Sequence, residues 1–201
     1  MTAVASQAAT LTAEQRDRRR RVIDAAFELG AEHGYDAVQM RDVSAIANVS
    51  LATIYRYFSS KDHLLAAAMT EWTARLQTRV AQSPPRGDTA ADQLSDVLHR
   101  ACRAMARQPK LSAALVRALS SSDEGVRESA VAVQQQLEAM ASGILADLAP
   151  AVRSDILAVL GHVWYSTLVA WANGRIDFAQ VTSELDRAVH VLVDPYDGPK
   201  R

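Results

Sequence analysis

The sequence predicts an all-α protein of about nine helices. Prolines and glycines divide the 201 residues into segments of helical length, and no sustained alternation of apolar and polar residues is bounded by hairpin signals. Hydrophobic residues make up 49% of the chain and charged residues 22%, which supports a packed core and excludes a disordered or collagen-like chain. This length allows one sizeable helical domain, or a small domain joined to a larger one.

Charge and cysteine content narrow the function classes. The formal net charge is -1, so a nucleic-acid site has to be a local feature of the surface. The single cysteine, Cys102, excludes an internal disulfide and predicts a cytoplasmic protein. Residues 1–11 lack the charge and the apolar run of a secretion signal, and we expect a mobile tail there and no membrane partner. The apolar stretch 156–172 is short for a bilayer span and is predicted to be a buried helix.

A first helix is predicted over residues 12–33. Thr12 and Gln15 have the spacing of a capping box, and Gly34 supplies the stop at the other end. The apolar face of this helix comprises Ile23, Ala26, Phe27 and Gly30.

Two short helices are predicted next, over residues 41–47 and 51–57. Between them Asn48 tolerates the left-handed conformation of a tight turn, and Ser50 can cap the second helix. Two short helices joined so closely form a helix-turn-helix. The side chains expected to pack inside it are Val43, Ile46, Ala47, Val49, Ile54 and Phe58.

The remaining chain is predicted to be helical as far as residue 193. Ser60 caps a long amphipathic helix over 61–82, which the SPPRGD sequence ends. Pro109 suits a first helical turn, and Ser121 with Glu124 has capping-box spacing. The further helices are expected at 89–107, 110–120, 123–147, 151–173 and 177–193.

The stretch VSAIANVSLATIYRYFSSKDHLL resembles the DNA-binding signature of the TetR family of transcriptional regulators. The order is specific: an apolar helix, a turn, Thr-Ile-Tyr-Arg-Tyr-Phe, two small polar residues, a lysine, an acidic residue and Leu-Leu. The YRYFSSKDHLL sequence and the arginine-rich first helix also resemble the sterol-catabolism repressors within that family. The resemblance implies a DNA-binding domain at 12–60, an effector-binding and dimerisation domain at 61–195, and a second tail at 196–201.

The resemblance also implies roles for individual residues of the helix-turn-helix. Leu51, Ala52 and Thr53 stand where the family meets base edges, and Arg56 reads guanine or contacts phosphate. The remaining phosphate contacts are assigned to Arg41, Ser50, Tyr55, Tyr57 and Lys61, with Ser50 alternatively serving only as the helix cap. Leu51 and Ala52 are apolar and can at most meet a thymine methyl, so the operator sequence is not predicted.

The sequence departs from the usual family pattern at Met40, Ser44 and Asn48. Met40 replaces a common hydroxyl residue and loses one phosphate contact, whereas Asn48 accepts the backbone region of the usual glycine. The arginine-rich run at 16–21 has two interpretations, a phosphate or minor-groove contact and a solvated helix end.

An enzyme is not predicted, and neither is a cofactor. The sequence contains no nucleophile motif, P-loop or dinucleotide fingerprint. Asp96, His99 and Cys102 align on one helix, but this spacing is typical of packing and we expect no metal site.

Function is predicted to depend on a small, apolar effector and on a homodimer. A repressor of this family leaves its palindromic operator when the effector binds, with the helix over 61–82 as the lever, although activation stays an alternative. The last two long helices are expected to form the dimer interface, and the resemblance implies recognition helices roughly 34 to 36 Å apart. The effector site is expected to use Met69, Trp72, Met105, Leu119, Gln136, Met140, His162 and Tyr165.

Two alternatives accompany this prediction. His162 can instead be a core or dimer-interface histidine. An all-α ligand carrier or protein interaction module without DNA binding is the alternative for the whole chain, and salt-sensitive DNA binding distinguishes the two classes.

Overall fold

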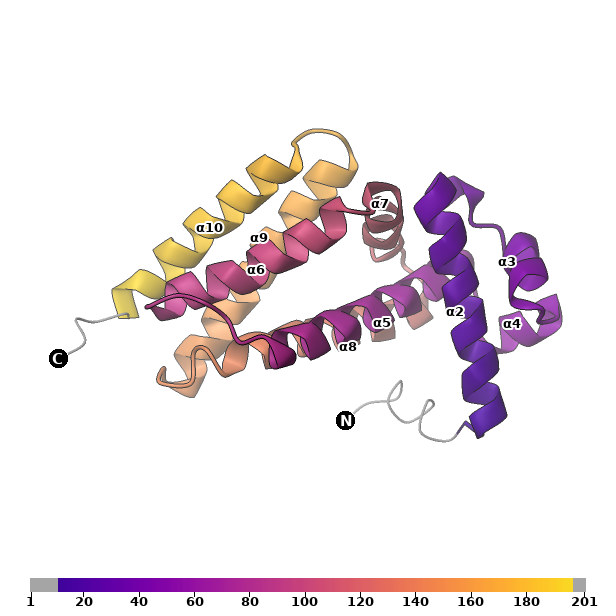
Figure 1. Ribbon diagram of the computed structural model, residues 1–201, viewed down its shortest axis with the longest axis horizontal. Coiled ribbons are helices and arrows are strands. Elements are labelled where there is room, and N and C mark those ends of the chain that lie inside the picture. Colours follow the sequence, from indigo (N-terminus) through magenta and orange to yellow (C-terminus); the bar gives the residue numbers. More distant parts are fainter. Residues whose placement is uncertain (1–10, 197–201) are drawn as a thin grey trace. The chain divides into compact units, whose positions relative to one another are not determined.

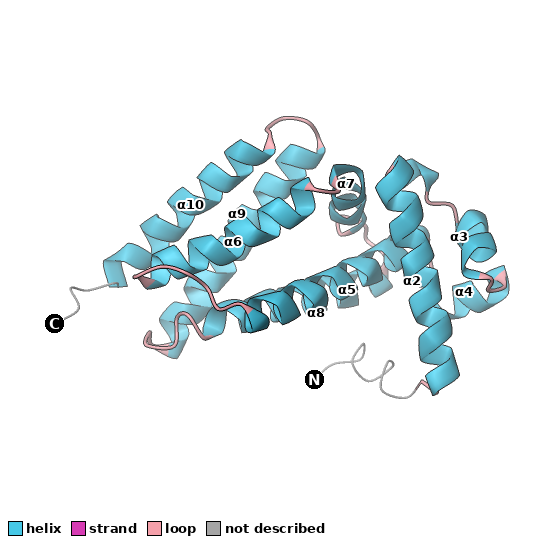
Figure 2. Ribbon diagram, viewed as in Figure 1, coloured by secondary structure: helices cyan, strands magenta, loops and turns pink. Residues whose placement is uncertain are grey.

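The computed structural model describes residues 11–196 and confirms the all-α fold class (Figures 1 and 2). The two predicted tails lie almost wholly outside the described residues. Within residues 11–196 the chain forms nine α-helices, two 3₁₀ turns and no strand. The α-helices are α2 Ala13–His33, α3 Met40–Ala47, α4 Leu51–Tyr57, α5 Lys61–Gln82, α6 Ala90–Ala106, α7 Pro109–Ala118, α8 Glu124–Ser142, α9 Pro150–Ala172 and α10 Phe178–Val193, and the 3₁₀ turns are η1 Tyr35–Ala37 and η2 Asp194–Tyr196.

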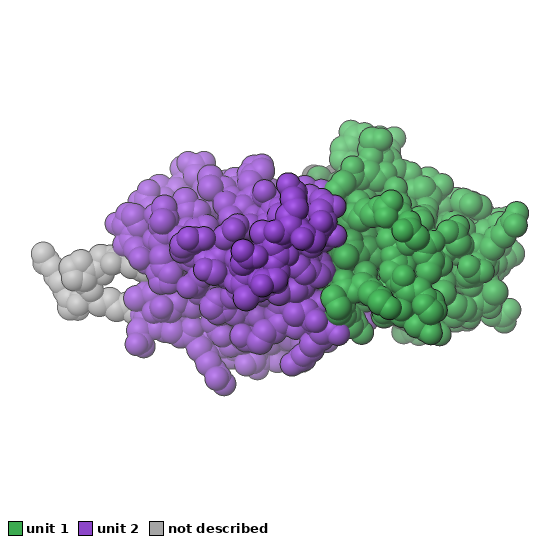
Figure 3. Space-filling model, turned by 90° about the horizontal axis from the view of Figure 1, so that it is seen from above, with its two compact units in different colours: residues 1–72, 108–133 green, residues 73–107, 134–201 purple. Residues whose placement is uncertain are grey.

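The helices group into two compact units, coloured separately in Figure 3. The first unit contains residues 11–72 and 108–133, and the second contains 73–107 and 134–196. Helices α5 and α8 each contribute their first part to the first unit and the remainder to the second. The proposed boundary at residues 60/61 divides the chain once along its sequence. The two units are instead defined by which helices pack together, so each contains two separate segments of the chain.

The first unit forms because α2 packs against α3, α4 and α7. The N-terminus of α2 has the predicted capping box. Gln15 N–H donates to Thr12 Oγ1 (3.2 Å), and Thr12 N–H donates to Gln15 Oε1 (2.8 Å). A Cβ at Gly30 would lie 2.9 Å from Leu111 Cδ1, so this glycine lets α7 approach α2 closely. The fully buried side chains of the helix-turn-helix part include Val22, Ile23, Ala26, Val43, Ile54 and Phe58.

The second unit is built around α10, which packs against α6 and α9. Buried side chains at helical spacing on the three helices form its core. They include Leu94, Ala101, Met105, Leu160, Leu168, Leu185 and Val189.

Helix α9 leaves much of its apolar surface uncovered within the described chain. By length and composition alone it is long and apolar enough to cross a membrane, and only 28% of that segment is buried. Val159 on this helix is 47% exposed and Tyr165 is 40% exposed. The prediction that residues 156–172 form a buried helix is therefore wrong for the single chain.

Three local predictions are also corrected. Ile46 is 45% exposed, because α3 turns it away from the side that carries Val43 and Ala47. Helix α8 ends at Ser142, five residues earlier than expected, where Gly143 opens a run of turns. Its N-terminus is capped by Asp123, whose Oδ1 accepts from Gly125 N–H (2.8 Å), and Ser121 does not cap it.

Candidate nucleic-acid interface

The turn between α3 and α4 is fixed by bonds within the turn. Asn48 adopts the left-handed conformation with φ 50°, as expected. Ser44, one of the departures from the family pattern, donates its hydroxyl to the Val49 carbonyl (2.7 Å), and Val49 N–H donates to the Ser44 carbonyl (3.2 Å). Ser50 caps α4 by accepting from Thr53 N–H (3.2 Å). These bonds set where α4 begins.

Helix α4 exposes a short polar face. Ile54 is fully buried on its inner side, whereas Ala52, Tyr55 and Arg56 are exposed, Tyr55 at 49%. Leu51, Thr53 and Tyr57 are half-buried, and Thr53 Oγ1 lies 2.8 Å from Ser50 Oγ. Among the predicted base-reading and phosphate-contacting residues of α4, Ala52, Tyr55 and Arg56 are therefore the most accessible.

Arg41 and Arg56 are both exposed, and neither has an ion pair in the part of the chain that the structure describes. An exposed guanidinium without a carboxylate partner keeps its charge available for phosphate. These two side chains are the clearest phosphate-binding candidates of the helix-turn-helix.

Lys61 has a local environment that the motif does not reveal. Its Nζ donates to the Tyr35 carbonyl (3.3 Å) and lies 3.9 Å from the centroid of the Tyr35 ring. Arg117 from α7 lies at the same distance from that ring, and its Nη1 is 3.4 Å from Asp36 Oδ1. Lys61 thus helps to hold η1 against the start of α5, and its phosphate contact stays a prediction.

The Tyr35 phenol is held by the same cluster. Its hydroxyl donates to Asp62 Oδ1 (2.5 Å). Burial, followed by the hydrogen bond and the charge of Asp62, raises the pKa of Tyr35 to about 12. The phenol remains a neutral donor at physiological pH, so the cluster stays intact there.

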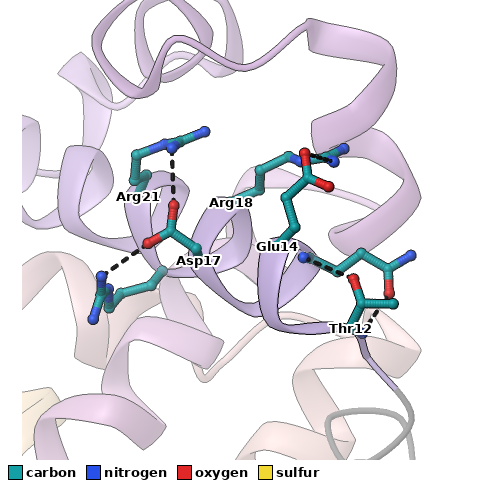
Figure 4. Close-up of polar contacts among 7 residues, drawn as sticks. Thr12, Glu14, Asp17, Arg18 and Arg21 are labelled. Carbon is teal, nitrogen blue, oxygen red and sulfur yellow. Dashed lines mark hydrogen bonds and ion pairs between the residues drawn. The ribbon is translucent and has the colours of Figure 1, made fainter.

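The arginine-rich run on α2 is largely paired with nearby acceptors (Figure 4). Asp17 holds both Arg20 and Arg21 at 2.9 Å, and Arg18 pairs with Glu14. Such exposed pairs are weak, so phosphate can replace the carboxylate partner. The remaining bonds join Arg16 to the Leu11 carbonyl (2.7 Å) and Arg19 to Glu71 (3.4 Å). The structure therefore leaves both interpretations of this run open.

The predicted effector residues are divided between the two units. Met69, Trp72 and Leu119 belong to the first unit, and the second holds Met105, Gln136, Met140, His162 and Tyr165. The three methionines are buried, and Trp72, Leu119 and Gln136 are half-buried. Gln136 Oε1 is buried and has no hydrogen-bond partner within the described residues.

His162 and Tyr165 are exposed on α9. His162 Nδ1 lies 2.7 Å from the Ala158 carbonyl of its own helix. The interpretation of His162 as a core histidine is therefore wrong within a single chain, while the dimer-interface alternative remains.

The second unit also carries a surface cleft of about 280 Å³ that contains none of the predicted effector residues. It is lined by Val152, Asp155, Ile156, Val159, Val191, Leu192, Pro195 and Tyr196. Its walls come from α9, the end of α10 and η2, and most of them are apolar.

Of the aligned residues Asp96, His99 and Cys102, the first two lie beside another ionisable side chain and the third is buried. Asp96 pairs with Arg100, and His99 Nε2 lies 3.4 Å from Asp186 Oδ1. Burial raises the pKa of the Cys102 thiol, which disfavours the thiolate that a metal would need. Within residues 11–196 no group of three or more His, Cys, Asp or Glu side chains is arranged to hold a metal ion.

The residues behind α4, the helix expected to enter the major groove and called the recognition helix here, were not predicted from the sequence. Arg19 lies over the Phe58 ring at 5.4 Å, and His63 meets the same ring edge-on at 5.5 Å. Asp123 bonds to Ser59, 64 residues away in the chain. No local motif signals such pairings, because they depend on how α2 and α8 pack around the end of α4.

Comparison with known proteins identifies the two halves of the chain. Residues 22–68 match the family described as bacterial regulatory proteins, tetR family, and residues 87–192 match the tetracyclin repressor-like C-terminal domain. The HTH-type transcriptional repressor KstR of Mycobacterium tuberculosis is 34% identical over 185 residues, covering 92% of this chain and 84% of that protein. KstR of Mycolicibacterium smegmatis is 33% identical and covers 98% of both chains. These relatives support the relationship to the sterol-catabolism repressors.

Solved structures agree with this relationship. A TetR transcriptional regulator from Rhodococcus sp. RHA1 superposes with a TM-score of 0.80 at 29% identity, over 90% of this chain and 97% of its own. FadR of Thermus thermophilus in complex with lauroyl-CoA shares the fold, with a TM-score of 0.68 at 19% identity over 91% and 98% of the two chains. The helix-turn-helix, the helical second half and these matches agree, and the chain belongs to the TetR family of transcriptional regulators.

Proposed function

We propose that the protein is a dimeric repressor that binds a palindromic operator and releases it when a small, apolar effector binds. The observation that carries the proposal is the face of α4, where Ala52, Tyr55 and Arg56 are exposed on a short helix with a fixed start. A helix of this size fits the major groove of B-DNA. Such a regulator acts on the chromosome, so we assign it to the cytoplasm and expect no enzymatic activity.

DNA binding is assigned to residues 12–60, and effector binding and dimerisation to residues 61–195. The contacts proposed for DNA are those of Arg41, Ser50, Leu51, Ala52, Thr53, Tyr55, Arg56, Tyr57 and Lys61. Arg41 and Arg56 are placed first because they are exposed and have no ion pair within the described residues.

Repression and the effector class are supported by the relatives. The KstR proteins are named as repressors. The FadR proteins of Bacillus subtilis and Thermus thermophilus, which share the fold, were solved with stearoyl-CoA and lauroyl-CoA. A fold that accommodates long acyl chains in those proteins is compatible with an apolar effector here, for which Met69, Trp72, Met105, Leu119 and Met140 supply apolar side chains and Gln136, His162 and Tyr165 polar ones.

The homodimer is assigned to α9 and α10. Val159, Tyr165 and Val191 expose apolar surface on these two helices, Val191 at 75%. Two copies that pair these helices across a two-fold axis bury that surface in a four-helix arrangement. The same symmetry presents two recognition helices to the half-sites of a palindrome.

The test captures fragments of the source genome on the purified protein and measures the affinity for the enriched sequence at several salt concentrations. An inverted repeat whose affinity falls steeply with salt is the expected result. Arg56→Ala removes one contact from each of the two half-sites, so it should weaken binding about tenfold and reduce the salt slope by about 2. Arg103→Ala, which removes the same charge from an exposed site on α6, is the matched control and should bind like the wild type. No enrichment by folded, dimeric protein would overturn the proposal in favour of a ligand carrier or interaction module.

A further inference from the structure

The second residue after the recognition helix α4, Ser59, is bonded to the residue that caps α8. Helix α4 ends at Tyr57, Phe58 is buried, and Ser59 comes next. The Ser59 hydroxyl lies 3.0 and 2.9 Å from the two oxygens of Asp123 and donates its one proton to this carboxylate. A hydrogen bond to a charged acceptor is stronger than one between neutral groups.

Asp123 cannot move independently of α8, because it is the N-terminal cap of that helix. Its Oδ1 accepts from Gly125 N–H at 2.8 Å, and its carbonyl accepts from Val126 N–H and Arg127 N–H. Burial raises the pKa of Asp123, but hydrogen bonds from Ser60, Ser59 and Gly125 outweigh it and hold the pKa below its usual value. The carboxylate is therefore charged at neutral pH, which is the form that accepts from Ser59.

His63 and Gly125 make a second contact between the same two segments. A Cβ at Gly125 would lie 2.3 Å from His63 Nδ1 and 2.5 Å from two ring carbons, so only glycine fits against the ring. The Ser59 backbone N–H donates to His63 Nδ1 (3.2 Å), which assigns the ring proton to Nε2. The ring also meets Phe58 edge-on, so α8, His63 and the end of α4 pack as a continuous set.

Helix α8 then continues beyond the first unit. Residues as far as Val133 belong to the first unit, and residues from Gln134 onward belong to the second unit. The helix is unbroken from Glu124 to Ser142, so its first turn is joined by regular helix to the unit that holds most of the proposed effector and dimer residues.

We propose that Ser59, His63, Asp123 and Gly125 form a clasp through which the first turn of α8 holds the recognition helix in its operator-binding position. None of the four reads bases in this role; they are positioning residues that act through α4. The clasp rests on the proposed function for its operator readout, and it adds α8 to α5 as a connection between the recognition helix and the second unit.

The first experiment is a double-mutant cycle measured as operator affinity. Ser59→Ala removes the hydroxyl, and Asp123→Ser keeps a capping oxygen on α8 but lacks the reach to Ser59. Each variant should weaken binding about five- to tenfold, and the double variant should be no weaker than the weaker single variant. Ser59→Thr keeps the hydroxyl and should bind like the wild type. Ser122 is an exposed serine beside Asp123, so Ser122→Ala should also bind like the wild type.

The Asp123 variant also separates the clasp from simple charge effects. Removing a carboxylate lessens repulsion of DNA phosphate, so a purely electrostatic role predicts tighter binding by Asp123→Ser. The clasp predicts weaker binding. Tighter or unchanged binding, or single effects that add in the double variant, would overturn it.

The second experiment needs no DNA and therefore distinguishes failure of the clasp from failure of the proposed function. In Gly125→Ala the His63 ring must move, and amide hydrogen exchange across residues 54–59 should accelerate about tenfold while α10 keeps its wild-type protection. Gly143→Ala, where a Cβ meets nothing within 4 Å, is the matched control. Unchanged exchange at 54–59 in folded Gly125→Ala, or equal acceleration in both variants, contradicts the clasp whether or not the wild type binds an operator.

Discussion

The two units of the chain differ in how much of their apolar surface the chain itself covers. In the first unit, α2 packs against three other helices, and polar contacts such as those of Tyr35 and Asp123 join segments far apart in the sequence. In the second unit α9 is apolar along most of its length, yet little of it is buried. The first unit thus has a surface suited to water and phosphate, whereas the second has a surface suited to another apolar surface.

Two valines show the difference most directly. Val131 in the first unit and Val159 in the second are both 47% exposed. Val131 has exposed Arg127 and Gln135 four residues away on either side, while Val159 has Val163 four residues later and lines the apolar cleft with Val191. Equal exposure of one residue is uninformative; an extended apolar patch around it indicates an interface.

The largest predicted effect tests this contrast with one substitution at each valine. Val159→Arg places a charged and longer side chain in the proposed dimer interface, so the dimer should dissociate to monomers and operator affinity should fall by about 100-fold or more, because linked binding of two half-sites is lost. Light scattering measures the mass, and fluorescence anisotropy measures the affinity. Val131→Arg is the matched control and should remain dimeric. Dissociation by both variants, or by neither, would remove the proposed distinction between the two faces.

The fold was predictable from the sequence because its signals are local. The capping box at Thr12, the left-handed Asn48 and the Ser50 cap act within four residues, and each was confirmed. Helix α4 has the predicted bounds, and the Ser50 cap that starts it stands directly before it. The cap of α8 was predicted wrongly because two nearby residues, Ser121 and Asp123, are both suitable cap residues. In the structure Gly125 N–H donates to Asp123, so Asp123 is the cap.

The candidate site was less predictable because its supporting contacts are not local. The family resemblance supplied the residues of α4, and the structure shows which of them are exposed. The resemblance could not supply Asp123 or Arg117, which contact Ser59 and Tyr35 from α8 and α7. The exposure of Ile46 and of α9 was missed for a related reason, since an apolar residue on an amphipathic helix is expected inside until its neighbours are known.

A smaller effect is expected from the capping boxes, which occur once in each unit with threonine as the cap. Thr12→Ala removes the acceptor for Gln15 N–H and should lower the free energy of unfolding by about 1 kcal/mol. Thr89→Ala should also lower it, and the Thr89 hydroxyl and N–H bonds hold the pKa of Asp92 below its usual value. The stabilisation from the charged Asp92 is present above its unfolded pKa of 3.8. It is lost as the pH falls through the lower pKa of Asp92 in the folded protein.

Urea unfolding of both variants at pH 7 and pH 3.5 checks this prediction. The Thr89→Ala loss should be smaller at the lower pH, because the contribution of Asp92 starts to diminish below its unfolded pKa of 3.8. The Thr12→Ala loss should change less, because its partner Gln15 does not titrate. A Thr89→Ala loss that is the same at both pH values contradicts the assignment.

The smallest predicted effects come from two histidines whose pKa values move in opposite directions. Burial lowers the pKa of His63, and the positive charge of Arg19 lowers it further. The negative charges of Asp123 and Glu128 oppose this decrease but do not cancel it. The hydrogen bond to Asp194 raises the pKa of His190, and the negative charges of Asp194, Asp186 and Asp92 raise it further. Partial burial opposes this increase but does not cancel it. His63 therefore disfavours folding as the pH falls below 6.5 toward its folded pKa. His190 stabilises the fold below 6.5, and this contribution is lost as the pH rises through its raised pKa.

Replacing each histidine by glutamine separates the two contributions. On acidification from pH 7.5 to 5.5, His63→Gln should lose less unfolding free energy than the wild type, because no buried ring has to take up a proton. His190→Gln should lose more, because the stabilising pair with Asp194 no longer forms. Urea titrations at the two pH values measure both differences, and each variant is the control for the other because the chemical change is the same. Changes of the same sign in the two variants would contradict the assigned environments, and with them the neutral His63 ring on which its contact with Ser59 N–H depends.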